Sequence, residues 1–241
     1  MKIAPVFSEN ALQVAFEDAY KRHKAGKKLN IADRNLLDAG LDASLRLLSI
    51  DPLTKSLNDN ALNQHLEEAV QHATRPEYKR KAVFIITDID NFAAFNAHTN
   101  YDIADNLLKT TFDYFKTIFR SGDHIARIHG DEGGILSPRL GEADTTIHGE
   151  LERRVRGGDI PSYLTYISEL DPTGIVGLSM GTVIIEPGMT VQDIRDKATD
   201  ALKHVKYLKK AEKRKDINVA QWDAGIEYEP MKEWLTEYAK S

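Results

Sequence analysis

Residues 127–134 read RIHGDEGG, and this stretch places two adjacent carboxylates, Asp131 and Glu132, in a glycine-rich turn between apolar segments. Upstream, the apolar run VFIIT at 83–87 ends in a second acidic group, Asp88 and Asp90. Two strand ends that each carry carboxylates can together hold Mg²⁺ beside the phosphates of a nucleotide. The sequence therefore predicts a metal and nucleotide site where these two segments meet.

Composition favours a folded, soluble protein. Of the 241 residues, 41% are hydrophobic and 29% are charged, which is typical of globular proteins. No apolar run approaches the ~20 residues that span a bilayer, and the N-terminus does not resemble a signal peptide. Cys is absent, so we expect a cytoplasmic protein without disulfides or membrane contact. The net charge of −5 argues against nucleic-acid binding by the surface as a whole.

The pattern of apolar residues divides the chain into three parts. Residues 1–50 are expected to form an N-terminal helical extension, with Asp33 as a candidate helix cap. A stripe of leucines in it suits a core or a partner helix, and so a dimer; its members are Leu37, Leu41, Leu45 and Leu48. Residues 51–223 are expected to form one α+β domain, and residues 224–241 a tail with one short helix.

Within residues 51–223, apolar runs alternate with amphipathic segments. The expected strands cover 82–88, 124–129, 133–137, 174–185 and 217–222. The expected helices cover 62–73, 103–119, about 145–155 and 191–210. The second and third strands read as a hairpin whose turn holds Gly130, Asp131 and Glu132.

Several motifs recur in an order that resembles the GGDEF family, the diguanylate cyclases. Residues 51–54 (DPLT) are similar to the family's opening motif, residues 88–92 (DIDNF) to its Asp-x-Asp-x-Phe, and residues 129–133 (HGDEG) stand at its signature. The resemblance covers roughly residues 51–223. It implies a ferredoxin-like, palm-type fold, an antiparallel sheet with helices packed against it.

The resemblance also implies an activity and its partners. Family members condense two GTP molecules into cyclic di-GMP with release of pyrophosphate, using Mg²⁺ or Mn²⁺. Each domain holds one GTP, so the resemblance implies a homodimer with two domains face to face. We expect GTP and cyclic di-GMP as the small-molecule partners.

Site roles carry over by position. Asp88, the main-chain carbonyl of Ile89 and Asp131 would hold the metal. Asp131 or Glu132 would accept the proton of the attacking 3′-hydroxyl, and the sequence does not choose between them. The backbone amides at 91–93, which include Asn91 and Phe92, would form a nest for phosphate.

The remaining roles concern the nucleotide and the product. Asn96 and Asp105 would bracket guanine, because a carboxylate accepts from its N1–H and exocyclic amine; the alternative for Asp105 is an exposed helix residue. Lys206 and Lys210, four residues apart on one helix face, would grip the β- and γ-phosphates. Other lysines of this basic run, namely Lys203, Lys209, Lys213 and Lys215, read as a solvated face.

Arg120 and Asp123 resemble the family's Arg-x-x-Asp inhibitory site for the product. Such a short motif also arises by chance, and Arg120 closes an amphipathic helix, so both readings stay open.

Two residues depart from the signature. His129 replaces its first Gly and would stand beside the α-phosphate with Gly130, either blocking it or donating a hydrogen bond to it. Gly133 replaces its closing Phe, which is expected to loosen the turn. Three readings follow: an active cyclase, a catalytically inactive module that binds GTP or cyclic di-GMP as a receptor, and a polymerase-like or alternative cyclase that uses another nucleotide.

Overall fold

The computed structural model of the protein describes residues 9–37, 49–75, 81–140, 162–214 and 218–238. The chain divides into two compact units, residues 1–50 and residues 51–241, and each is described here by itself.

In the first unit, helix α1 (Glu9–Lys24) is followed by Gly26, whose φ of +66° suits a helix stop. The next helix begins after Asn30, which accepts a hydrogen bond from the amide of Asp33 at 2.7 Å, while Asp33 accepts from the amide of Asn30 at 3.2 Å. Asn30 is therefore the cap, and the predicted cap Asp33 is its reciprocal partner. The rest of the predicted leucine stripe, residues 41, 45 and 48, lies outside the described residues.

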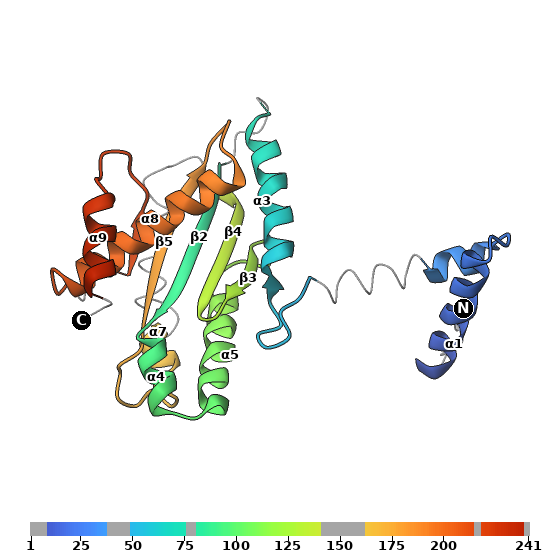
Figure 1. Ribbon diagram of the computed structural model, residues 1–241, viewed down its shortest axis with the longest axis horizontal. Coiled ribbons are helices and arrows are strands. Elements are labelled where there is room, and N and C mark those ends of the chain that lie inside the picture. Colours follow the sequence, from blue (N-terminus) through green and yellow to red (C-terminus); the bar gives the residue numbers. More distant parts are fainter. Residues whose placement is uncertain (1–8, 38–48, 76–80, 141–161, 215–217, 239–241) are drawn as a thin grey trace. The chain divides into compact units, whose positions relative to one another are not determined.

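The second unit is built on a six-stranded sheet in the order β1-β3-β4-β2-β5-β6 (Figure 1). Its four central strands pair antiparallel, whereas β1 pairs parallel with β3 and β6 pairs parallel with β5. The strands are β1 (Leu57–Asn58), β2 (Lys81–Asp90), β3 (His124–His129), β4 (Glu132–Leu140), β5 (Gly177–Ile185) and β6 (Val219–Gln221).

The palm-type α+β fold predicted from the sequence is confirmed, but the sheet is mixed rather than wholly antiparallel. The chain crosses from β5 to β6 through a helix, α8, and such a crossover joins parallel neighbours. The two-residue edge strand β1 has no prediction in the sequence, because it is too short to show a pattern.

Six helices accompany this sheet in the described part of the unit: α3 (Asp59–Ala73), α4 (Phe92–His98), α5 (Tyr101–Ile118), α7 (Tyr163–Tyr166), α8 (Val191–Lys210) and α9 (Glu229–Tyr238). The predicted helices at 62–73, 103–119 and 191–210 are found, as is the short helix of the tail. The short helices α4 and α7 are not predicted, and the helix expected around 145–155 lies outside the described residues. None of the described helices is both long and apolar enough to cross a membrane.

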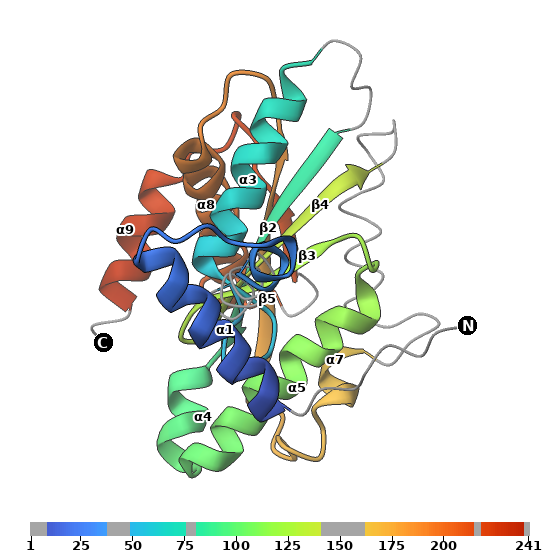
Figure 2. The same ribbon diagram turned by 90° about the vertical axis from the view of Figure 1, so that its right-hand side faces the viewer.

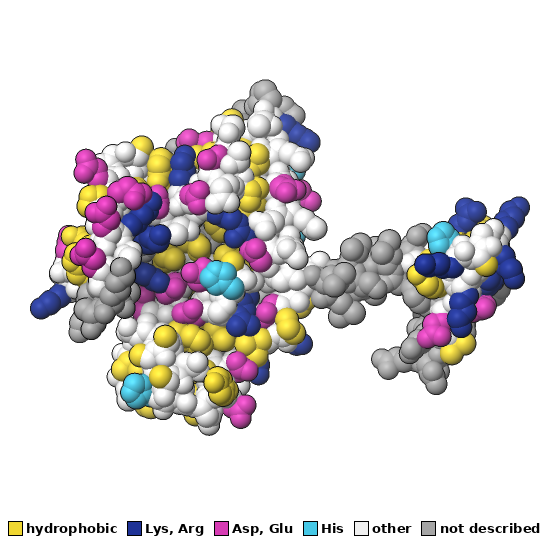
Figure 3. Space-filling model, in the orientation of Figure 1, with side chains coloured by type: hydrophobic (Ala, Val, Ile, Leu, Met, Phe, Trp, Pro, Cys, Tyr) yellow, Lys and Arg dark blue, Asp and Glu magenta, His cyan; other side chains and the backbone are white. Residues whose placement is uncertain are grey.

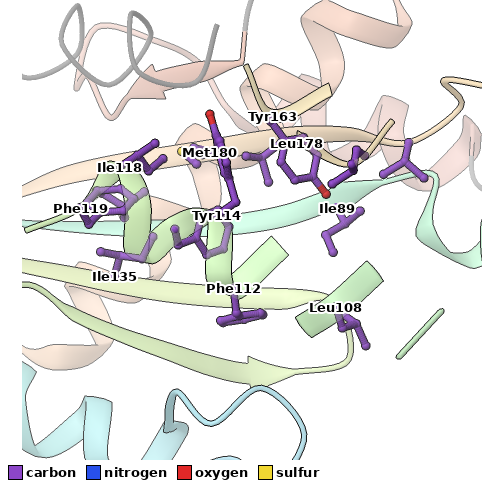
Figure 4. Packing of buried hydrophobic residues seen from close by; sticks show 14 of the residues in the cluster. Ile89, Leu108, Phe112, Tyr114, Ile118, Phe119, Ile135, Tyr163, Leu178 and Met180 are labelled. Atoms are coloured by element: carbon purple, nitrogen blue, oxygen red, sulfur yellow. The ribbon is translucent and has the colours of Figure 1, made fainter. Parts of the chain in front are cut away.

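Strand β2 separates two hydrophobic cores. Its side chains alternate between faces, so that Val83 and Ile85 enter a cluster with α5 and α7, while Phe84 and Ile86 enter a cluster with α3 and α8. Figure 2 shows α3 and α8 on one side of the strands and α5 with α7 on the other. Figure 4 shows the first cluster, in which Phe112 and Tyr114 lie among side chains of the sheet. Burial on both faces explains why β2 reads as a continuous apolar run.

Helix α8 lies directly on β5 at Gly181. A Cβ built at Gly181 would stand 2.1 Å from the carbonyl oxygen of Ala198 and 2.2 Å from the amide nitrogen of Leu202, both in the α8 backbone. The absence of a side chain at this position therefore sets how closely α8, and the lysines it carries, approach the sheet.

We predict that Gly181→Ala destabilises the protein by about 3 kcal/mol, because the backbone of α8 must move away from β5. Urea unfolding followed by circular dichroism measures this change. Gly122→Ala is the matched control, since no heavy atom lies within 4 Å of its built Cβ, and it should change stability by less than about 0.5 kcal/mol. Equal effects of the two substitutions would contradict the close approach.

Candidate nucleotide and metal site

The end of β2 places two acidic side chains on the face that α8 covers. Asp88 and Asp90 are two residues apart and so point the same way as Phe84 and Ile86. The Nζ of Lys206 on α8 lies 2.6 Å from Oδ2 of Asp88. The cross-strand partner of Asp88 on β4 is Glu132, which brings the signature turn beside the end of β2, as the sequence predicts.

The pKa of Asp88 is raised to about 6, mainly by burial and to a smaller extent by the negative charges of Asp131 and Asp90, against the opposing effect of Lys206. Asp131 is therefore close enough to Asp88 for the two carboxylates to repel each other. A site that gathers negative charge in this way fits a divalent cation. Within the described ranges no three His, Asp or Glu side chains cluster as a metal site; the predicted set needs only two carboxylates and the Ile89 carbonyl.

Arg127 connects the signature turn to the motif at 51–54. Its Nε donates to the carbonyl oxygen of Gly130 at 2.9 Å, and its Nη1 lies 3.4 Å from Oδ2 of Asp51. Burial alone would raise the pKa of Asp51, but hydrogen bonds from Thr54 and the charge of Arg127 hold it below its usual value. Gly130 has a φ of +52°, which explains the glycine in the turn.

His129 points outward from the turn rather than into it. Its side chain is 71% exposed, and its Nε2 lies 3.2 Å from Oε2 of Glu132. The imidazole thus engages one of the two candidate bases. This contact corresponds to neither of the two roles that the sequence suggests for His129, which are to block the α-phosphate and to donate a hydrogen bond to it.

Gly133, which the sequence predicts to loosen the turn, lies in the packed part of the sheet. It is buried and pairs with Thr87 of β2 and Arg127 of β3. A Cβ built there would stand 2.6 Å from Oγ1 of Thr87 and 3.2 Å from the ring of Phe112. Phe112 of α5 and Thr87 therefore already occupy the space that a larger residue would need.

The corner between β2 and α4 is held by a network that the sequence does not reveal. The Nζ of Lys209 lies 2.7 Å from Oδ2 of Asp90 and donates to the carbonyl oxygen of Leu178 at 2.8 Å and to Oγ of Ser179 at 3.1 Å. Ser179 in turn donates to Oδ1 of Asp90 at 2.7 Å. The sequence predicts that Lys209 lies on a solvated face. In the structure Lys209 is instead a structural residue. The signal available in the sequence was that Asp90 shares a face with Asp88 while Lys209 follows Lys206 by three residues.

Asn91 makes the turn from β2 into α4. It has a left-handed backbone with φ of 61°, and its Nδ2 donates to the carbonyl oxygen of Ile175 at 2.7 Å. Phe92 begins α4. The predicted phosphate nest at 91–93 therefore lies at the corner that follows Asp88 and Asp90.

The predicted guanine-binding residues lie on adjacent helices. Asn96 is on α4 and Asp105 is on α5, and both are half-buried. The buried Oδ1 of Asn96 has no hydrogen-bond partner among the described residues. A buried acceptor without a partner is costly unless a ligand satisfies it.

The predicted phosphate-binding and product-binding residues are placed differently. Lys210 is exposed, one turn beyond Lys206 on α8. Asp123 accepts from the backbone amide of Arg120 at 2.9 Å and from Oγ of Ser137 at 2.6 Å. Asp123 therefore has a structural role in the turn between α5 and β3, while the Arg120 side chain is exposed.

Figure 3 shows how these charges present themselves to solvent. On the face of the second unit that it displays, basic, acidic and histidine side chains gather over the middle, between α8 and α4.

Comparison with known proteins identifies the family of this chain. The family model for the diguanylate cyclase GGDEF domain matches residues 48–212. This chain belongs to the GGDEF family. The matched range includes β2, the signature turn and α8.

Among curated relatives, the chain is 27% identical over 175 residues to the diguanylate cyclase DgcP of Escherichia coli, covering 70% of this chain and 47% of DgcP. It is 32% identical over 112 residues to the bifunctional diguanylate cyclase/cyclic di-GMP phosphodiesterase MucR of Pseudomonas aeruginosa, covering 46% of this chain and 16% of MucR. The chain thus spans less than half the length of either relative.

Among solved structures, the coiled coil and GGDEF domain of DgcB from Caulobacter crescentus, in complex with c-di-GMP, superposes with a TM-score of 0.61 at 22% identity, covering 79% of this chain and 94% of that chain. The diguanylate cyclase SiaD from Pseudomonas aeruginosa, in complex with its activator SiaC, gives a TM-score of 0.54 at 23% identity, covering 82% and 74% of the two chains. At these identities the structures establish the fold.

We predict that Gly133→Phe, which restores the family-type aromatic residue, destabilises the protein by about 2–3 kcal/mol because Thr87 and Phe112 fill the space. Chemical denaturation measures the loss. Adding Phe112→Ala should recover part of it, since the double variant exchanges one aromatic ring for another. If Gly133→Phe were neutral, the packing described here would be wrong.

We also predict a pH-dependent effect of Asp88→Asn, measured with divalent metal chelated. Between the usual value of 3.8 and about 6, the folded state holds a proton that the unfolded state has released, so the stability of the wild type falls as pH rises through this window. Asn mimics the neutral carboxyl. The variant should therefore be about 1–2 kcal/mol more stable than the wild type at neutral pH.

Thermal and urea unfolding of both proteins from about pH 4 to neutral pH follow this difference, which should shrink toward zero at the acidic end, near the usual value of 3.8. A constant difference over the whole range would contradict an elevated pKa for Asp88.

Proposed function

We propose that this protein is a diguanylate cyclase, condensing two GTP molecules into cyclic di-GMP with release of pyrophosphate. The observation that carries the proposal is the register that sets Asp88 opposite Glu132, the residue after Asp131, with Lys206 of α8 2.6 Å from Asp88. These groups combine the carboxylates that a divalent cation requires with a cation for phosphate.

In this proposal Asp88, the Ile89 carbonyl and Asp131 hold Mg²⁺ or Mn²⁺. When bound, the metal neutralises charge on the triphosphate and favours displacement of pyrophosphate. The amides at 91–93 bind phosphate at the β2–α4 corner, and Lys206 and Lys210 bind the β- and γ-phosphates.

Guanine selection is assigned to Asn96 and Asp105. The unpartnered Oδ1 of Asn96 supports this role, because it can accept a hydrogen bond from an amine of the base. The carboxylate of Asp105 would accept from the N1–H and the exocyclic amine, a pair that adenine lacks.

Glu132 or Asp131 would take the proton of the attacking 3′-hydroxyl, which comes from a GTP on a second domain. The protein therefore acts as a homodimer, for which residues 1–50 are the candidate dimerisation element. We place it in the cytoplasm, where GTP is present. Arg120 would contact the cyclic di-GMP product, with Asp123 shaping its turn.

The second candidate is a receptor that binds GTP or cyclic di-GMP without catalysis. The contact between His129 and Glu132 favours it, because a base held by an imidazole is less available to a substrate hydroxyl. A cyclase that uses another nucleotide remains the third reading, and Asp105 argues against it.

Incubation of the purified protein with GTP and Mg²⁺, followed by chromatography and mass spectrometry of the products, tests the proposal. Cyclic di-GMP and pyrophosphate should form, and Asp131→Asn should lower the rate by about 100-fold or more. Asp113→Asn, an exposed carboxylate paired with Lys116 on the outside of α5, is the matched control and should retain the wild-type rate.

His129→Gly distinguishes the two leading candidates in the same assay. An active wild type whose rate rises with this substitution supports the cyclase with a restrained base. Tight GTP binding without product in both proteins would establish the receptor, and a mixed-nucleotide reaction that excludes GTP would establish the third reading.

A further inference from the structure

Lys206 lies against the carboxylate of Asp88, which the proposed function assigns to the metal. Its Nζ lies 2.6 Å from Oδ2 of Asp88, and the two side chains are only 25% and 12% exposed. An ammonium group at this distance forms a charge-assisted hydrogen bond to the carboxylate. The same carboxylate would be a ligand of the divalent cation in the proposed function.

The other carboxylates around Asp88 have their own partners. Asp90 is paired with Lys209 at 2.7 Å, and Glu132 lies 3.2 Å from His129. Asp131 forms no ion pair with any residue that the structure describes, yet its charge acts on Asp88. Lys206 is therefore the cation paired with Asp88, beside which Asp131 adds a negative charge.

Lys206 and a divalent cation cannot share this carboxylate freely. Mg²⁺ would bind a carboxylate oxygen at about 2.1 Å, and a positive charge that already lies against the same carboxylate repels it. The two cations thus compete for Asp88. Lysine is suited to yield, because its flexible four-carbon chain lets the ammonium group move to another anion.

We propose that Lys206 is a built-in counter-cation that must leave Asp88 before metal binds, and that nucleotide phosphate provides its new partner. This inference rests on the proposed function for the identity of the site. Its consequence is that metal alone binds weakly, whereas metal and nucleotide bind cooperatively, since each favours the state in which Lys206 has moved.

Binding of Mn²⁺ alone, followed by electron paramagnetic resonance of the free ion at neutral pH without nucleotide, tests this coupling. Lys206→Met keeps the length of the side chain and removes the charge, so it should bind Mn²⁺ about tenfold more tightly than the wild type. Lys203→Met is the matched control, because it removes the same charge from the same helix without touching Asp88. It should stay within about twofold of the wild type.

Asp88→Asn locates the effect. In this background the gain from Lys206→Met should disappear, since both cations have lost their common ligand. Circular dichroism establishes that each variant is folded. A Lys206→Met variant that binds Mn²⁺ no more tightly than the wild type, or a gain that persists with Asp88→Asn, would overturn the inference.

The failure of this inference and the failure of the proposed function give different results. Tighter Mn²⁺ binding by Lys206→Met, in a protein that makes no cyclic di-GMP, would leave the exchange intact and remove the cyclase. Unchanged Mn²⁺ binding in a protein that makes cyclic di-GMP would do the reverse.

Discussion

The structure depends on one constraint, the alternation of side chains along the central strand β2. Val83, Ile85 and Ile89 enter the core with α5 and α7, whereas Ala82, Phe84 and Ile86 enter the core with α3 and α8. Because the alternation continues beyond the apolar run, the side chains of Asp88 and Asp90 lie on the face of the sheet that α8 covers. The same geometry that packs two cores therefore delivers two carboxylates to the lysines of α8.

Charge balance is the second theme of the site. Three acidic side chains each meet a basic group of the same chain, at Lys206, Lys209 and His129. The two lysines differ in the number of their contacts. Lys209 donates to three acceptors and connects α8 to the start of β5. Lys206 has a single acceptor among the described residues. A pair with one contact exchanges partners more easily than one embedded in a network.

The sequence predicts most of the fold, because long amphipathic helices and buried strands have clear periodicities. Helix α8 and the hairpin of β3 and β4 are examples. It does not predict the edge strand β1 or the short helices α4 and α7, whose patterns are too brief. The mixed pairing of the sheet follows from a helical crossover, which periodicity alone does not specify.

Site prediction reaches the acidic residues but not their partners. The motif positions place Asp88 opposite Glu132, the residue that follows Asp131, in the register of β2 with β4, and the metal-binding role of this pair stays a prediction. A side chain at position 133 would meet Phe112, which lies 21 positions earlier on another element. A prediction from the signature position alone does not include this contact. The role of Lys209 is likewise tertiary, since its acceptors lie on β2 and β5.

The central claim of the proposal is that the end of β2 and the turn before β4 hold one divalent cation that carries GTP. Anomalous diffraction from a crystal grown with Mn²⁺ and a non-hydrolysable GTP analogue tests it most directly. The account predicts one manganese peak shared by Asp88, Asp131 and the analogue's phosphates, with Lys206 turned away from Asp88 toward phosphate. A nucleotide bound elsewhere, or manganese absent from these carboxylates while the nucleotide is present, would contradict it.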